Sequence, residues 1–269
     1  MTEPRPERLI ILAQYDPQGG LPAHVRIHLE ALRPCAARLV LVSNSPLSPD
    51  ARSRAEAICD SVRERPNTGY DFAAWRDVLA EEDMAAWDTV ILTNSSIIGP
   101  LYPIAPIIEE MESRGVDFWG LVYTKERAGH LQSFFLGFAR PLVTNHAWAS
   151  FWEAVEDLPD KWEVIKRYEI GLTRHFRKEG FRFAAYMPNP RFPRSIRMID
   201  VERLGSRIRL PWDINRAGRT IRDHRDMIEE GFPYLKASLL WGKDRHRLES
   251  ASFTEKMSDI DYPWKEVGF

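Results

Sequence analysis

Buried strands alternate with amphipathic helices along the first part of the chain. Continuous apolar runs at 8–14 (RLIILAQ) and 38–44 (RLVLVSN) are typical of strands covered on both faces. Apolar residues with helical spacing occupy 23–32 and 71–81, and a further apolar strand at 89–92 leads into the polar run TNSS. Strands that alternate with helices in this way predict a parallel α/β sheet.

The middle of the chain departs from that alternation. DFWGLVYT (117–124) and HLQSFFLGF (130–138) are aromatic and β-branched, which favours strands. The chain between them is too short for a crossover helix, so we expect a mixed or antiparallel addition to the sheet. Helical sequence then runs through 145–178, and FRFAAYMP (181–188) predicts a last strand.

The C-terminal part is rich in Pro and Arg. We expect residues 1–189 to form one catalytic domain and residues 190–269 an extension packed on it, with a helix near 220–230. Its arginines, with Trp212 and Trp241, either form an acceptor surface or belong to a solvated extension that only packs on the domain.

Composition excludes some partners. The 269 residues carry a net charge of −2, so there is no electrostatic case for binding nucleic acid. The N-terminus lacks the apolar run of a signal peptide, which predicts a cytoplasmic protein, with loose association to the inner membrane face left open. Cys35 and Cys59 fall in predicted helices and fit free core thiols, and the nine tryptophans are either core residues or platforms for sugar rings.

A turn at residues 66–69, within RERPNTGYDFAAWR, is the first candidate for a binding site. It follows a short predicted strand at 61–64 and opens a helix, the place where open α/β sheets bind ligands. Gly69 supplies backbone freedom, and Asn67 and Asp71 flank the turn with side-chain oxygens. Asp71 is expected to cap the helix with its carboxylate pointing outward.

Several charged side chains are candidates for chemistry, each with a structural alternative. Arg63 and Arg65 precede the turn and either meet a diphosphate or are solvated. Glu169 is expected on the apolar helix face of Trp162, where a raised pKa would suit a general base. The alternative is a buried Glu tied to an Arg or a backbone amide.

Glu169 shares that expected face with three further apolar residues, Ile165, Leu172 and Phe176. His130, at the start of a strand, either binds a phosphate or hydroxyl or has a structural role. The sequence has no Walker loop, GxGxxG, GxSxG, HExxH or zinc spacing, which removes the enzyme classes that depend on those motifs.

A series of motifs in a shared order gives the chain a family resemblance. They are YDPQG, LVSNSPLS, RPNTGYDFAAW, LTNSSIIGPLYP, DFWG, HLQSFFLGF, YEIGLTRHFRKEG and EEGFPYLKASLL. On these residues the chain resembles the rhamnan synthesis protein F family, over nearly its whole length. The resemblance implies a nucleotide-sugar-dependent transferase with a GT-A-like, Rossmann-type mixed sheet flanked by helices.

The resemblance also implies roles for individual residues. Glu169 would be the catalytic base, with His130 in the same catalytic site. The triplet Asn94, Ser95 and Ser96 would lie at the diphosphate. The donor nucleotide would be bound by Gln14, Asn44, Arg63, Asn67, Gly69, Tyr70 and Asp71.

One departure from the family pattern concerns a metal cofactor. The resemblance implies Mg²⁺ or Mn²⁺ at the diphosphate, held by an Asp where this chain has Ser95. A hydroxyl is a poor ligand for a hard divalent ion, so metal dependence is in doubt. Asp71 or Asp16 would have to supply the carboxylate, or Arg63, Arg65 or His130 would have to neutralise the diphosphate instead.

Three functions follow as hypotheses. The first is a glycosyltransferase that moves rhamnose or another deoxyhexose to a glycan or lipid-linked acceptor in bacterial polysaccharide or lipopolysaccharide biosynthesis, with inversion. The second is a catalytically impaired module that binds nucleotide or glycan. The third is a scaffold in a polysaccharide-assembling complex.

Overall fold

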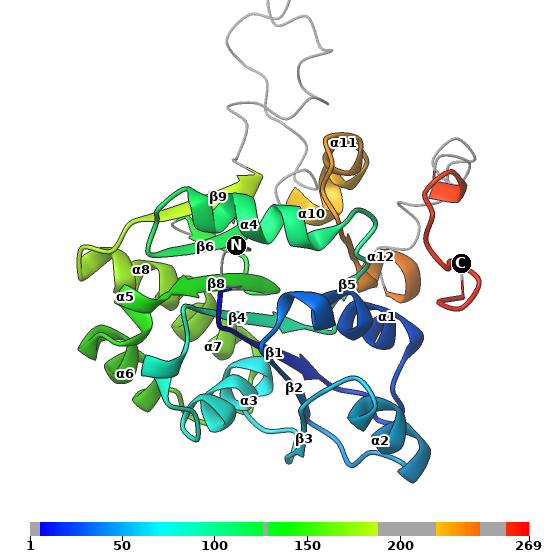
Figure 1. Cartoon of the computed structure of the whole chain (residues 1–269), viewed down its shortest axis with the longest axis horizontal. Coiled ribbons are helices and arrows are strands. Elements are labelled where there is room, and N and C mark those ends of the chain that lie inside the picture. Colours follow the sequence, from blue (N-terminus) through cyan, green and yellow to red (C-terminus); the bar gives the residue numbers. More distant parts are fainter. Residues whose placement is uncertain (1–5, 126–128, 188–218, 243–256, 269) are drawn as a thin grey trace, which may run out of the picture.

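A sheet with parallel strands forms the centre of the protein (Figure 1). The computed structural model describes residues 6–125, 129–187, 219–242 and 257–268. Four parallel strands lie in the order β3-β2-β1-β4, which confirms the predicted Rossmann-type half. These strands are β1 (Arg8–Gln14), β2 (Arg38–Ser43), β3 (Ser61–Glu64) and β4 (Thr89–Asn94).

The other half of the sheet is mixed, as the sequence predicts. Its path continues from β4 through β8 to β6, and both pairings are antiparallel, while β9 is parallel to β6. The run HLQSFFLGF is two strands and not one, because the backbone N–H of Ser133 turns aside and donates to Glu169. The strands are β6 (Phe118–Thr124), β7 (His130–Leu131), β8 (Phe135–Ala139) and β9 (Phe183–Met187).

Two helical layers cover the two faces of the sheet. Alternate residues of β1 enter two separate apolar clusters: Leu9 and Ile11 face one layer, and Ile10 and Leu12 face the other. One layer holds α1 (Ala23–Leu32), α2 (Pro49–Glu56) and α4 (Ile104–Ser113). The opposite layer holds α3 (Tyr70–Leu79), α5 (Arg140–Val143), α6 (His146–Glu153) and α8 (Ile170–Lys178).

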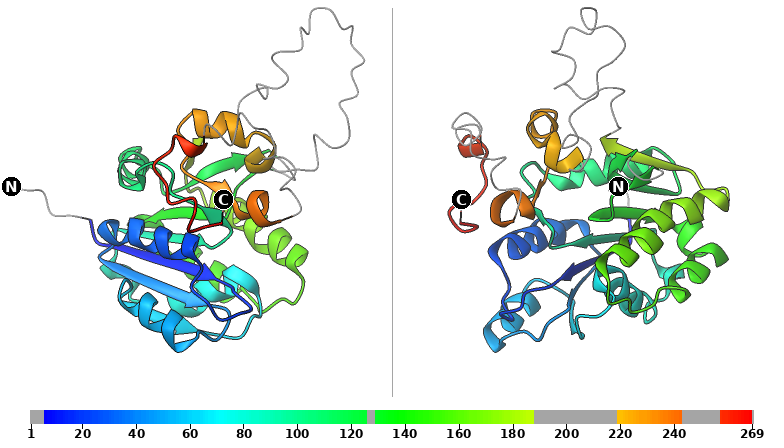
Figure 2. Two further views of the ribbon diagram at one scale, coloured as in Figure 1. Left: turned by 90° about the vertical axis from the view of Figure 1, so that its right-hand side faces the viewer. Right: turned by 180° about the vertical axis from the view of Figure 1, so that it is seen from behind.

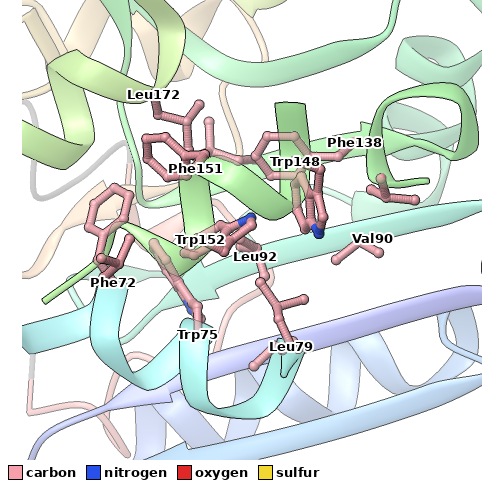
Figure 3. Packing of buried hydrophobic residues seen from close by; sticks show 14 of the residues in the cluster. Phe72, Trp75, Leu79, Val90, Leu92, Phe138, Trp148, Phe151, Trp152 and Leu172 are labelled. Atoms are coloured by element: carbon pink, nitrogen blue, oxygen red, sulfur yellow. The ribbon is translucent and has the colours of Figure 1, made fainter. Parts of the chain in front are cut away.

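Aromatic side chains fill the layer between α3 and α6. Phe72 and Trp75 of α3 lie across from Trp148 and Trp152 of α6, beside Leu92 of the sheet (Figure 3). The two α6 rings have centroids 5.4 Å apart in an edge-to-face arrangement. This packing supports the core interpretation for these tryptophans, whereas Trp162 and Trp241 are exposed and Trp212 lies outside the described residues.

The predicted helix at 145–178 is interrupted. After α6 the chain is non-helical until α7 (Lys161–Val164), which continues through one π-helical turn, Ile165–Glu169, into α8. Asp160 begins α7 by accepting hydrogen bonds from two backbone N–H groups, those of Trp162 and Glu163. The interruption places residues 154–160 against the turn at 66–69.

The C-terminal segment contributes a strand to a second, two-stranded sheet. Strand β10 (Leu235–Lys236) pairs with β5 (Ile97–Ile98), and the short helix α12 (Ala237–Trp241) lies beside α1 (Figures 1 and 2). The predicted helix at 220–230 is two short ones, α10 (Arg219–Arg222) and α11 (His224–Glu229).

The two cysteines are buried and free, as predicted. Cys35 lies in a 3-10 turn (Arg33–Cys35), whereas Cys59 lies in the connection between α2 and β3 and not in the predicted helix. Burial raises the pKa of the Cys59 thiol to about 12.

Within the described parts of the chain, none of the helices combines the length and the apolar character needed to cross a bilayer.

Gly137 in β8 provides a test of this packing. A Cβ added there would lie 2.2 Å from Cε2 of Trp119, whose ring is 1% exposed and stacks on Phe135. We expect Gly137→Ala to lower the free energy of unfolding by about 1–3 kcal/mol, because the ring has no room to move. Chemical denaturation would measure the change.

Gly171→Ala in α8 is the matched control. The nearest atom to its added Cβ is 4.0 Å away, and alanine favours a helix, so stability should be kept or raised. Equal destabilisation by both substitutions would contradict the proposed packing of Trp119.

Candidate functional site

Polar side chains gather at the carboxyl edge of the sheet. Strands β1, β2 and β4 end there in Gln14, Ser43 and Asn94, all buried. Because β8 is antiparallel to β4, the start of β8 meets the end of β4, with Phe135 opposite Thr93. Strand β7 pairs with the end of β6 and brings His130 to the same edge.

Asp71 lies at the centre of this edge. Gly69, with φ of 66°, is the residue that precedes α3, so Asp71 is the second residue of the helix. Its carboxylate is half-buried and accepts a hydrogen bond from Nδ2 of Asn94 at 2.8 Å. The expected outward cap is therefore wrong, because Gly69 takes the cap position and the Asp71 carboxylate turns onto the sheet edge.

Burial raises the pKa of Asp71 to about 6. The negative charge of Glu169 also raises it, whereas Lys161, Lys236 and the hydrogen bond from Asn94 oppose the shift. Asp71 is thus a carboxylate that can gain or lose a proton near neutral pH, a property common at catalytic sites.

The triplet at the end of β4 contributes the side chains of Asn94 and Ser96 and the backbone of Ser95. Oδ1 of Asn94 accepts from the backbone N–H of Ser96 at 3.1 Å and from its hydroxyl. Ser95 participates through its backbone, since its N–H donates to the carbonyl of Ala13 and its carbonyl oxygen lies 3.0 Å from Nε2 of His24. Asn94 and Ser96 therefore orient each other beside Asp71.

Lys236 reaches this cluster from the far end of the chain. Its Nζ donates to the Ser96 hydroxyl at 3.3 Å and lies 4.2 Å from the ring centroid of Phe134. Burial lowers the pKa of Lys236 to about 8, although the negative charges of Glu169 and Asp71 act in the opposite direction. Our sequence analysis did not single out Lys236, and a signal was present: one lysine within the apolar run FPYLKASLL.

Glu169 is the last residue of the π-helical turn, and its negative charge acts on Asp71. Its Oε1 accepts from the backbone N–H of Ser133 at 3.1 Å and lies 3.9 Å from Nε2 of His130. The bond to a backbone amide matches the structural alternative stated above, and it also fixes the carboxylate at the site. The expected shared face with Trp162 is wrong: Trp162 is 59% exposed, because the π-helical turn shifts the register between them.

Arg65 ties the turn at 66–69 to its surroundings. Its side chain is largely buried, forms ion pairs with Asp77 and Asp157, and donates to Oδ1 of Asn44 at 3.1 Å. Thr68 donates to the same Asp157 carboxylate at 2.6 Å. Arg65 is therefore committed to holding the loop.

The other predicted donor-site residues fall into two groups. Nε2 of Gln14 donates to the carbonyl of Gly20, and Tyr70, with φ of 54°, donates its hydroxyl to the carbonyl of Pro159. Gln14 lies next to Asn44, whose backbone N–H donates to the Gln14 carbonyl. Arg63 pairs with Glu81, and Asn67 is exposed, so the structure does not bring these two into the cluster.

The cluster fits a divalent metal ion poorly. Among the residues that the structure describes, no group of three or more His, Cys, Asp or Glu could hold a metal ion. Both oxygens of Asp16 accept hydrogen bonds within its own loop, from the backbone N–H groups of Gln18 and Gly20. Asp71 has Asn94 as partner and the cation Lys236 nearby, which disfavours a second cation.

The raised pKa of Asp71 predicts that Asp71→Asn increases the free energy of unfolding, and that the increase depends on pH. The folded-state pKa is raised, so the wild-type carboxyl ionises first in the unfolded chain and stability is lost between about pH 4 and pH 6. Asparagine can still accept from Asn94. We expect Asp71→Asn to match wild type near pH 4 and to exceed it by on the order of 2 kcal/mol at pH 7.5 in urea melts.

Asp157→Asn is the control of opposite sign. The hydrogen bond from Thr68, with help from Arg76 and Arg65, lowers the pKa of Asp157, so its charge stabilises the fold at neutral pH. That variant should lose stability at pH 7.5. A destabilised Asp71→Asn at pH 7.5 would contradict the environment described here.

Comparison with solved structures gives distant similarities. Glucosyl-3-phosphoglycerate synthase from Mycobacterium tuberculosis, solved with Mn²⁺ and UDP, aligns over 51% of this chain and 58% of its own at 17% identity, with a TM-score of 0.36. A cytidylyltransferase from Leptospira borgpetersenii aligns over 69% and 77% at 12% identity, with a TM-score of 0.40. Scores this low do not carry residue roles from those proteins to this one.

Curated relatives are similar over about two thirds of the chain. An uncharacterized protein of Sinorhizobium fredii, y4gN, is 29% identical over 187 residues, which are 67% of this chain and 49% of that protein. The virulence protein VirA of Vibrio anguillarum is 27% identical over 198 residues, 68% of this chain and 62% of its own length. The chain thus spans about half to three fifths of these relatives.

A family model matches more than half of the chain and settles the affiliation. The model described as rhamnan synthesis protein F matches residues 39–197, which include Asp71, Asn94, His130 and Glu169. The match confirms the resemblance found in the sequence motifs, and the chain belongs to the rhamnan synthesis protein F family.

Proposed function

We propose that this protein is a glycosyltransferase that uses a nucleotide-sugar donor. The observation that carries the proposal is the meeting of Asp71, Glu169 and Lys236 at the carboxyl edge of a Rossmann-type sheet. Ligands of open α/β sheets bind at this edge, and sugar transfer from a nucleotide needs both a base and a cationic group there. The family affiliation supports the same activity.

We assign the role of catalytic base to Glu169. The amide of Ser133 fixes one of its oxygens, and a carboxylate has a second oxygen that can take the proton of an acceptor hydroxyl. The acceptor oxygen would then form a bond to the anomeric carbon as the bond to the diphosphate breaks, which inverts the configuration. His130, whose Nε2 lies 3.9 Å from this carboxylate, would belong to the same catalytic site.

The donor nucleotide would lie along the ends of β1 and β2, over Gln14 and Asn44. The turn at Gly69 and Tyr70 borders this region, and Asp71 marks its junction with the catalytic cluster. Residues 1–189 would form the catalytic domain, and the extension 190–269 would serve the same site through Lys236. By the family's name, the sugar would be rhamnose or a related deoxyhexose, and the acceptor a growing or lipid-linked glycan.

A second candidate function is a binding module without transfer. It is favoured by one observation: one oxygen of the Glu169 carboxylate already accepts a hydrogen bond from a backbone amide, which is the contact expected of a structural glutamate. Such a module would bind the donor and leave it intact.

A thermal-shift screen would identify the donor. UDP, GDP, CDP and dTDP sugars are each added with and without Mn²⁺, since a ligand specific to the folded state raises the melting temperature. We expect one nucleotide to raise the melting temperature, and that result would identify the nucleobase of the donor. The absence of any shift would count against both candidate functions.

Glu169→Gln separates transfer from binding. We expect conversion of the identified donor to fall by about 10²–10⁴-fold, because the amide cannot accept the proton, while donor affinity stays within about threefold. Glu163→Gln, at a side chain 52% exposed on α7, is the control and should convert the donor normally. Unchanged turnover in Glu169→Gln would refute the base assignment, and a wild type that binds but never converts would favour the binding module.

A further inference from the structure

The backbone fixes the position of Lys236. Lys236 pairs with Ile97 in the β10–β5 ladder, and the next residue, Ala237, donates its N–H to the carbonyl of Ser96 at 2.9 Å. Two main-chain contacts therefore hold the lysine against the end of β4. The side chain then reaches the Ser96 hydroxyl, 3.3 Å from its Nζ, and the ring of Phe134.

The ammonium of Lys236 has neutral close contacts and an open approach. It donates to the Ser96 hydroxyl and lies over the Phe134 ring. Asp71 and Glu169 act on it as charges, and Lys161 adds a second positive charge to the same cluster. Ser96 is exposed, so a ligand at the sheet edge can reach the group that Lys236 binds.

The two arginines that precede the turn at 66–69 already pair with carboxylates. Arg63 pairs with Glu81, and Arg65 pairs with Asp77 and with Asp157. Taking either arginine for a ligand would break an ion pair that holds the loop or the outer strand. Lys236 can instead exchange a hydroxyl for a phosphate oxygen, which gains a charge-assisted hydrogen bond.

A metal ion would have to occupy the same place with poor ligands. The described residues offer no suitable set of three carboxylate, imidazole or thiolate groups, and Ser95 supplies only backbone contacts to Ala13 and His24. A divalent ion beside the ammonium would also be repelled by it. The chemistry of the site therefore favours a protein cation over a divalent one.

We propose that Lys236, supported by Lys161, binds the diphosphate of the donor and takes the place of a divalent metal ion. This inference rests on the proposed function, and it adds the residue that stabilises the leaving group. As the anomeric carbon–oxygen bond breaks, the electron pair goes to the diphosphate oxygen, and the fixed ammonium balances the negative charge that develops there. The extension thereby completes the catalytic site.

The test is binding of UDP, GDP, CDP, dTDP and inorganic pyrophosphate in EDTA, measured by calorimetry on the full chain. We expect at least one nucleoside diphosphate to bind without metal, and Lys236→Met to weaken it by at least tenfold. Methionine keeps the apolar stem, so the variant should fold, and a melting curve checks this. Lys166→Met, at a side chain 75% exposed, is the control and should bind as wild type does.

A pH series adds a readout that a merely structural role would not move. Affinity in EDTA should fall as the pH rises through about 8 and above, because Lys236 loses its proton, and this fall should be absent in Lys236→Met. Asp71, Glu169 and Lys161 face the same ammonium and still titrate in Lys236→Met. A pH effect that disappears in this variant therefore comes from Lys236 itself.

Two outcomes would overturn the inference, and they are distinguishable. Nucleoside diphosphate that binds only with Mn²⁺ and equally well to Lys236→Met would refute the role of Lys236 and leave the proposed function intact. Failure of every nucleoside diphosphate to bind, with and without Mn²⁺, would refute the proposed function together with the inference.

Discussion

Burial of the central strands on both faces is the constraint on which the rest of the structure depends. Every residue of β1 and β4 is buried, so the sheet needs a helical layer on each side, and most side chains along these two strands are apolar. Polar groups must collect where the strands end. Parallel order then puts those ends together, and the antiparallel strand β8 adds Ser133 and Phe134 to the same edge.

Much of the fold follows from local sequence. The bounds of β1 and α1 match their predicted ranges because continuous apolar runs and helical spacing are local signals. The predicted helix at 145–178 is broken because contacts with the turn at 66–69 hold residues 154–160 in a non-helical form, as in the bond from the Gly69 N–H to the Leu158 carbonyl. Such contacts leave no periodic pattern in the sequence.

The candidate site also combines residues that local sequence motifs indicate with residues that only distant contacts bring into place. The sequence motifs indicated Asp71, Asn94 and Glu169, and the structure brings these three together. Lys236 could not be placed, because its position depends on a two-residue ladder with a strand about 140 positions earlier. The π-helical turn likewise changes which residues share a face with Glu169, and its single inserted position has no recognisable sequence signal.

The ladder between β5 and β10 has a consequence for biosynthesis. Strands β1 to β4 can assemble from the first hundred residues as they leave the ribosome, where folding proceeds from the N-terminus. The ammonium of Lys236 joins them only after a further stretch of more than a hundred residues has been translated. A nascent chain therefore possesses Asp71, Lys161 and Glu169 well before Lys236, so the cluster acquires its second cation late in synthesis.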